Sequence, residues 1–179
     1  VNLDPEIVTN PETGQLDIVV NIGKARKNFV ERIEIVNNVG TKDTVVRREF
    51  ELVEGDAFSQ IKLDESIRNI RNLGFFSDVK VRNLVGSSDE QTITELTVEE
   101  KSTGELSIGL GYSSLEQTSL TFGIDERNFL GTGRALSLSF DLSQKQTNFR
   151  LGIAEPYLFG RNLTGRAGVF HDKLKQGSV

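Results

Sequence analysis

The sequence predicts an α+β domain followed by an antiparallel all-β region. Helical and strand periodicities both occur before residue 103, whereas only strand periodicity is found after it. Most of the 17 glycines lie beyond position 100. The charge changes at the same place, because residues 1–103 carry a net charge of −6 and residues 104–179 carry +1. We therefore expect a domain boundary near residue 103.

Composition excludes several classes of protein. No run of 18 apolar residues occurs in the 179 residues, so a transmembrane helix is not expected. The chain has no cysteine, which excludes disulfides and thiol chemistry. The acidic first region argues against a nucleic-acid partner, since phosphate binding requires a positive surface.

The first 22 residues contain a turn at residues 9–14 and an alternating strand at residues 18–22. This is too little sequence to bury a core. We interpret residues 1–22 as the last strands of a preceding domain.

The next 75 residues predict the order β-α-α-β-β. A strand is expected over residues 29–38, followed by a short helix from Lys42 to about Phe50 that Thr41 would cap. A second helix begins at Ser59 or Gln60 and ends at Gly74 in a left-handed conformation. Its apolar residues have helical spacing on one face: Leu63, Ile67, Ile70 and Leu73. Two strands then complete a two-layer unit, at residues 75–83 and 91–100.

Beyond residue 103, the pattern predicts five strands of the length that a tilted membrane strand needs. In the first four, large apolar residues alternate with small or polar ones, while the fifth is mixed. Phe129, Tyr157 and Phe159 lie in two connecting turns, as expected of an aromatic girdle at one rim of a barrel. The expected strands are residues 104–113, 118–127, 134–143, 147–155 and 163–172.

The first of these strands shows the alternation most clearly, in the run GELSIGLGY. Bulky residues on one face and small residues on the other are compatible with two settings. One is a membrane β-barrel, with the bulky face toward lipid, and the other is a soluble sandwich with an unusually bare outer face. The four strands that follow favour the barrel.

The residues provide no catalytic or metal-binding set. His171 is the only histidine and has no cysteine partner, so a zinc site or a histidine-based triad is not expected. Asp64 and Glu65 are neighbours on a helix and point to different sides. We therefore expect a protein that is not an enzyme and has no cofactor or metal. The remaining chemistry is interaction chemistry, at the open edges of the predicted sheets.

Several segments resemble the BamA family of outer-membrane β-barrel assembly factors. The α+β part resembles the last POTRA domain of that family, and the later part resembles its first barrel strands and periplasmic turns. The matching segments are TVVRREF (44–50), Glu54-Gly55, RNLGFF (71–76), GLGY (109–112), NFLGTG (128–133) and EPYLF (155–159).

This resemblance implies a three-part organisation from the middle of a longer protein. Residues 1–22 would be the C-terminal strands of a preceding POTRA domain, residues 23–102 the last POTRA domain, and residues 103–179 the N-terminal strands of an outer-membrane β-barrel. The implied location is the bacterial outer membrane, with the POTRA part in the periplasm.

The resemblance also implies a function. The chain would receive unfolded outer-membrane proteins by β-augmentation of the POTRA sheet and insert them through a lateral gate at the first barrel strand. Its partners would be those substrates, accessory lipoproteins of the assembly complex and outer-membrane lipid. About five strands of the family's 16 are expected, so the sheet cannot close. We therefore also expect self-association through the exposed strand edges.

The residues that the resemblance assigns to sites fall into three groups. Accessory-lipoprotein docking would involve Arg47 and Glu54. The periplasmic turn would comprise Asn128, Phe129, Gly131 and Gly133. The lateral-gate strand would comprise Gly104, Leu106, Ile108, Gly109, Leu110, Gly111 and Tyr112.

Two alternatives remain open from the sequence. A polypeptide-secreting transporter would have the same plan of POTRA domains and barrel. A soluble periplasmic peptide-binding module would have a sandwich in place of the barrel strands.

Overall fold

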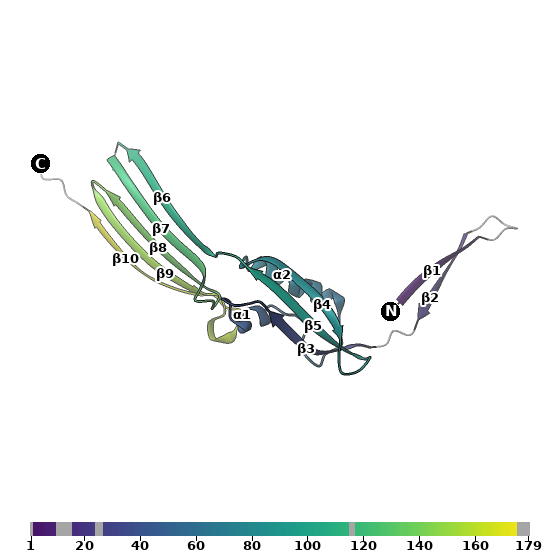
Figure 1. Cartoon of the computed structure of the whole chain (residues 1–179). Helices are drawn as coiled ribbons and strands as arrows, with labels where there is room; N and C mark the ends of the chain where they lie inside the picture. Colours follow the sequence, from purple (N-terminus) through teal and green to yellow (C-terminus); the bar gives the residue numbers. More distant parts are fainter. Residues whose placement is uncertain (1, 10–15, 24–26, 115–116, 175–179) are drawn as a thin grey trace, which may run out of the picture.

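The computed structural model describes residues 2–9, 16–23, 27–114 and 117–174, which form three separate β-sheets (Figure 1). The first sheet pairs β1 (Asn2–Thr9) with β2 (Leu16–Gly23) in antiparallel fashion. The turn expected at residues 9–14 lies mostly outside the described residues. No helix among the described residues is long and apolar enough to cross a membrane.

The second sheet belongs to an α/β unit, defined here as residues 29–100. Its elements are β3 (Phe29–Val36), α1 (Asp43–Arg47), α2 (Gln60–Asn72), β4 (Phe76–Val85) and β5 (Gln91–Glu100). The strand order is β3-β5-β4, with β5 parallel to β3 and antiparallel to β4. The predicted order β-α-α-β-β is therefore confirmed.

The core of this unit lies between the helices and one face of the sheet. Val46 of α1, Ile70 of α2 and Leu96 of β5 are completely buried there. The opposite face is covered by ion pairs, such as those between Arg32 and Glu34 and between Arg82 and Glu95. The alternation in each strand thus separates a dry face from a charged one.

The helix ends agree with expectation at α2 and differ at α1. The Ser59 hydroxyl accepts a hydrogen bond from the Lys62 amide, and Gly74 has a φ of +73°. The prediction that Thr41 caps α1 is wrong, because Lys42 occupies the capping position and no side chain caps that helix. Thr41 is instead buried against a turn of the third sheet.

The third sheet is a five-stranded antiparallel meander in the order β10-β9-β8-β7-β6. A single 3-10 turn, Leu158–Gly160, lies between the last two strands. The strands are β6 (Gly104–Ser113), β7 (Gln117–Phe129), β8 (Arg134–Ser143), β9 (Gln146–Glu155) and β10 (Gly165–Leu174).

The register aligns like residues into rows across this sheet. One row of the bulky face runs from Leu106 through Ile124, Leu138 and Leu151 to Val169. The opposite face carries a polar row, in which the Asp141 carboxylate accepts a hydrogen bond from the Thr121 hydroxyl and pairs with Arg150. Arg150 also pairs with Asp172.

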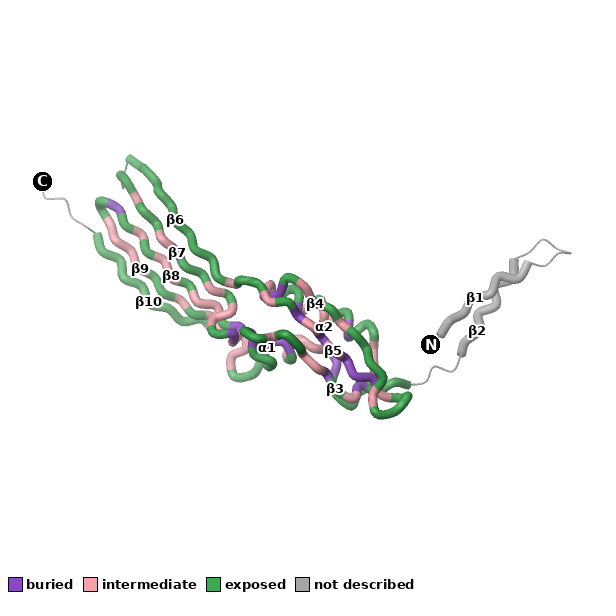
Figure 2. The backbone as a smooth tube through the Cα atoms, in the orientation of Figure 1, coloured by how far each residue is buried: buried purple, intermediate pink, exposed green. Residues whose placement is uncertain are grey.

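The two larger sheets differ in how their apolar residues are covered. Figure 2 shows the buried residues concentrated in the α/β unit, whereas the five-stranded sheet is mostly exposed. Leu110 and Tyr112 of β6 are 81% and 80% exposed. A contiguous apolar face of this kind is typical of a surface that meets lipid or a partner protein.

Candidate functional site: a free edge strand and its junction

Strand β6 is one edge of the five-stranded sheet and pairs only with β7 among the described strands. Its apolar residues Leu106, Ile108 and Leu110 are all exposed. The outer edge of β6 therefore presents unpaired N–H and C=O groups beside an apolar face, which together favour addition of another strand.

The glycines of β6 lie opposite hydroxyl-bearing residues of β7. Gly109 is paired with Thr121, and Gly111 with Ser119. A Cβ atom at Gly111 would lie 2.8 Å from the Ser119 hydroxyl oxygen, so that hydroxyl would have to rotate to admit a side chain, whereas a Cβ atom at Gly109 would lie 3.7 Å from its nearest neighbour. Glycine also lowers the stability of a strand by about 0.5–1 kcal/mol relative to alanine. The two glycines therefore make β6 less stable than a strand with alanine at these positions.

A compact junction joins the α/β unit to the turn between β7 and β8. The Lys42 amide donates to the Gly131 carbonyl oxygen at 2.9 Å. The Asn128 side-chain amide donates to the Thr41 hydroxyl at 2.8 Å, while its carbonyl oxygen accepts from the Gly133 amide at 2.8 Å. One asparagine thus holds the turn in shape and connects it to the first domain.

Glycine is required at both ends of the Gly131-Thr132-Gly133 segment. Gly131 and Gly133 have φ values of +68° and +72°. A Cβ atom at Gly131 would lie 1.8 Å from the Gly40 carbonyl oxygen, and one at Gly133 would lie 3.1 Å from a Val45 methyl carbon. The backbones of the two units are therefore in direct contact, which no other residue would allow.

Glu100, the last residue of β5, fixes the other side of the junction. Its carboxylate accepts hydrogen bonds from the amides of Gly40 and Thr41, at 2.7 and 2.6 Å. Partial burial raises the pKa of Glu100, but these bonds and one from the Thr41 hydroxyl outweigh it, so that the pKa is lowered overall. Residues 40–42 are thus held between β5 and the β7–β8 turn.

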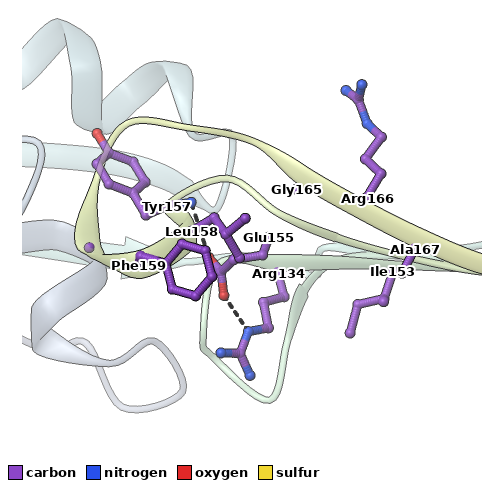
Figure 3. Close-up of a pocket in the computed structure, with 10 residues that line it drawn as sticks. Arg134, Ile153, Glu155, Tyr157, Leu158, Phe159, Gly165, Arg166 and Ala167 are labelled. Atoms are coloured by element: carbon purple, nitrogen blue, oxygen red, sulfur yellow. Dashed lines mark hydrogen bonds and ion pairs between the residues drawn. The ribbon is translucent and has the colours of Figure 1, made fainter.

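The turn between β9 and β10 makes a second contact with α1. The Arg48 guanidinium lies over the Tyr157 ring, 4.1 Å from its centroid. Figure 3 shows this ring directed away from the ion pair between Arg134 and Glu155. Tyr157 therefore packs on the α/β unit instead of joining an aromatic rim, whereas Phe159 is 88% exposed.

Two cavities flank this second contact. One of about 620 Å³ lies beside the β9–β10 turn, at the end of the five-stranded sheet, and is lined by residues that include Arg134, Tyr157 and Phe159 (Figure 3). The other, of about 370 Å³, lies between the sheet and α1. Both are open hollows, and the residues that line them do not form a catalytic arrangement. Among the residues that the structure describes, no cluster of acidic residues, histidine and cysteine could hold a metal ion.

The structure brings Arg47 and Glu54 together, with 3.3 Å between their charged atoms. Both also bind the backbone of β3. The Ile33 amide donates to the Glu54 carboxylate at 2.8 Å, and the Arg47 guanidinium donates to the Ile33 carbonyl oxygen at 3.2 Å. The sequence did not reveal this arrangement, because the three residues are 7 to 21 positions apart and belong to different elements.

A family model, curated relatives and a solved structure show what this chain is similar to. A model of POTRA domains, described as "Surface antigen variable number repeat", matches residues 29–101. The outer membrane protein assembly factor BamA of Neorickettsia risticii is 31% identical over 172 residues, which cover 96% of this chain and 23% of that relative. A putative outer membrane protein assembly factor of Treponema pallidum is 32% identical over 154 residues, covering 83% of this chain and 18% of that protein.

A solved structure has the same architecture. BamA from Haemophilus ducreyi lacking POTRA domains 1–3 is 27% identical, with a TM-score of 0.85 over 96% of this chain and 32% of that one. The present chain spans about a quarter or less of the length of the two curated relatives.

We predict that Gly131→Ala breaks the junction. The new methyl group would overlap the Gly40 carbonyl, so the bond from the Lys42 amide to residue 131 should be lost. Hydrogen exchange of the Lys42 amide should then become at least about tenfold faster. Gly160→Ala is the matched control, because Gly160 has a φ of +71° and nothing within 4 Å of an added Cβ. Equal effects of the two substitutions would show that backbone strain alone matters.

We also predict that the junction loosens in acid. A carboxyl group with a lowered pKa contributes stability that is fully present above its ordinary value of 4.5, and this stability is lost as the pH falls through the lower folded-state value. Protection of the Gly40 and Thr41 amides from hydrogen exchange should therefore fall below about pH 4.5, after correction for intrinsic rates. Glu100→Gln should remove this pH dependence and Glu99→Gln should keep it. A pH-independent protection in the unchanged chain would contradict the role of Glu100.

Proposed function

Because the chain belongs to the BamA family of outer-membrane protein assembly factors, we propose that it receives unfolded outer-membrane proteins and inserts them into the membrane as β-barrels. As in its family, the chain lies in the outer membrane with its POTRA domain in the periplasm. The relatives are assembly factors, which agrees with a role that is not enzymatic.

The division of the chain that we propose has three parts. Residues 1–22 close a preceding POTRA domain, residues 23–102 form the last POTRA domain, and residues 103–179 begin the barrel. The junction at residues 40–42 and 128–133 supports the second boundary, because it holds two sheets that share no strand.

Strand β6 carries the proposal. It is an exposed edge with a lipid-compatible face, and the three-residue link Lys101–Thr103 attaches it directly to the central strand of the POTRA sheet. We infer that it is one side of a lateral gate, at which an incoming strand adds to the sheet. The low strand stability that Gly109 and Gly111 impose is suited to a seam that opens.

The POTRA sheet provides a second place for an extended substrate. Strand β4 is an edge, with β5 as its only partner among the described strands. Its end, Leu84 and Val85, is exposed and apolar. An unfolded polypeptide could add there by backbone hydrogen bonding, which is insensitive to sequence and therefore suited to many substrates.

The proposed role of β6 as a lateral gate can be tested by site-specific photo-crosslinking in the whole protein. A photo-reactive residue at Ile108 or Leu110 should crosslink to a nascent outer-membrane protein during its assembly. The same residue at Leu138 is the control, because β8 lies between β7 and β9 and has no free edge. Equal yields from β8, or none from β6, would refute the gate.

For accessory-lipoprotein docking at Arg47 and Glu54, we predict that Arg47→Glu lowers co-purification of a lipoprotein. Arg68→Glu is the control, since Arg68 is also an exposed helical arginine with a nearby carboxylate partner. Exposed charges contribute little to stability, so reversal of the charge at Arg47 should leave the fold intact. Since Arg47 also binds Ile33, far-UV circular dichroism must accompany the assay. Unchanged co-purification would contradict docking at Arg47, whose role would then be limited to its bond with the Ile33 carbonyl.

A further inference from the structure

Each edge of the POTRA sheet has one residue whose outward backbone groups are held by side chains. On β3 this residue is Ile33, whose amide donates to Glu54 and whose carbonyl accepts from Arg47. We call Arg47 and Glu54 the β3 clamp. The carboxylate takes the place that a carbonyl of an added strand would have, and the guanidinium takes the place of an amide.

On β4 the corresponding residue is Val79. Its amide donates to the Asp78 carboxylate at 2.8 Å, and its carbonyl accepts from the Arg71 guanidinium at 3.0 Å. We call Arg71 and Asp78 the β4 clamp. The two clamps come from unrelated parts of the chain, yet both combine one arginine and one carboxylate on a single edge residue.

The remainder of the β3 edge is also covered. The Val30 amide donates to the Asp56 carbonyl at 2.9 Å, and the Val30 carbonyl accepts from the Gly55 amide at 2.7 Å. The Phe58 amide donates to the Asn28 carbonyl at 2.7 Å. The loop at residues 55–58 and the β3 clamp therefore close this edge from residue 28 to residue 33.

The β4 edge is closed only at its beginning. The Gly86 amide donates to the Gln91 carbonyl. Because hydrogen-bonded pairs alternate along an antiparallel ladder, the backbone amide and carbonyl groups of residues 80, 82 and 84 face β5. Val81, Asn83 and Val85 then present their amide and carbonyl groups outward. These residues form an open stretch beyond Val79 on which the described part of the chain places no other strand.

We propose that the two clamps select the edge and the register at which the domain takes an extended segment of an unfolded polypeptide. The segment adds along residues 81–85 of β4, the β4 clamp stops it before Val79, and the β3 clamp excludes it from the other edge. This inference rests on the proposed β-augmentation and specifies where it occurs. The occupant makes backbone bonds to three residues, so it is recognised as a short extended strand and not by its sequence.

Photo-crosslinking on the full chain tests this selection. The probe is a synthetic peptide with the sequence of residues 134–143, RALSLSFDLS, which has the alternation of a barrel strand. Photo-reactive residues are placed singly at Glu34 on β3, at Ser77 before the β4 clamp and at Asn83 in the open stretch. In the otherwise unchanged chain, the yield at position 83 should exceed the yields at positions 34 and 77 by about tenfold.

Variants of the two clamps should each raise the crosslinking yield at a different position. Arg47→Met with Glu54→Gln should raise the yield at position 34 by about tenfold, and Arg71→Met should do so at position 77. Arg68→Met is the matched control on α2 and should change neither. Retained crosslinking at position 83 shows in each variant that the sheet is intact.

The outcomes separate the two proposals. Equal yields at positions 34 and 83 in the unchanged chain, or a pattern that the clamp variants leave unaltered while position 83 still reacts, would overturn the selection by clamps but keep β-augmentation. Absence of crosslinks at all three positions in every variant would overturn β-augmentation itself.

Discussion

The structure depends on one backbone contact, between residues 40–42 of the POTRA domain and the β7–β8 turn. The bond from the Lys42 amide to the Gly131 carbonyl forms because Gly131 has no side chain and tolerates a positive φ. The Lys101–Thr103 link adds one backbone bond to each unit, from the Lys101 amide to the Phe75 carbonyl and from the Arg127 amide to the Thr103 carbonyl. With residues 40–42 held between Glu100 and this turn, strand β6 leaves the POTRA domain in one direction.

The same strand alternation serves two environments in this chain. In the POTRA domain, helices α1 and α2 cover the apolar face, and the other face carries ion pairs toward water. In the five-stranded sheet no helix covers the apolar face, and the polar face carries the Thr121, Asp141 and Arg150 network. In our proposal, lipid covers this second apolar face, and the unpaired edge of β6 is the place where an incoming strand adds.

Local patterns predicted the element types well, because period 2 and period 3.6 are properties of neighbouring residues. The start of α2 at Ser59 and the left-handed Gly74 followed from the same local rules. Contacts between distant segments were not predictable in this way. Thr41 was expected to cap α1 but binds Asn128. Tyr157 was assigned to an aromatic girdle but lies under the Arg48 guanidinium. Nothing in the sequence indicated that Arg47 and Glu54 bind the backbone of Ile33.

The junction should make the POTRA domain and the first barrel strands one rigid unit. Double electron–electron resonance tests this claim. Spin labels at Lys62 on α2 and Leu142 on β8, in the whole protein in lipid nanodiscs, report the distance between the two parts. A rigid junction predicts a single narrow distance distribution at neutral pH. A broad or multiple distribution, as expected for two units joined only by residues 101–103, would contradict it.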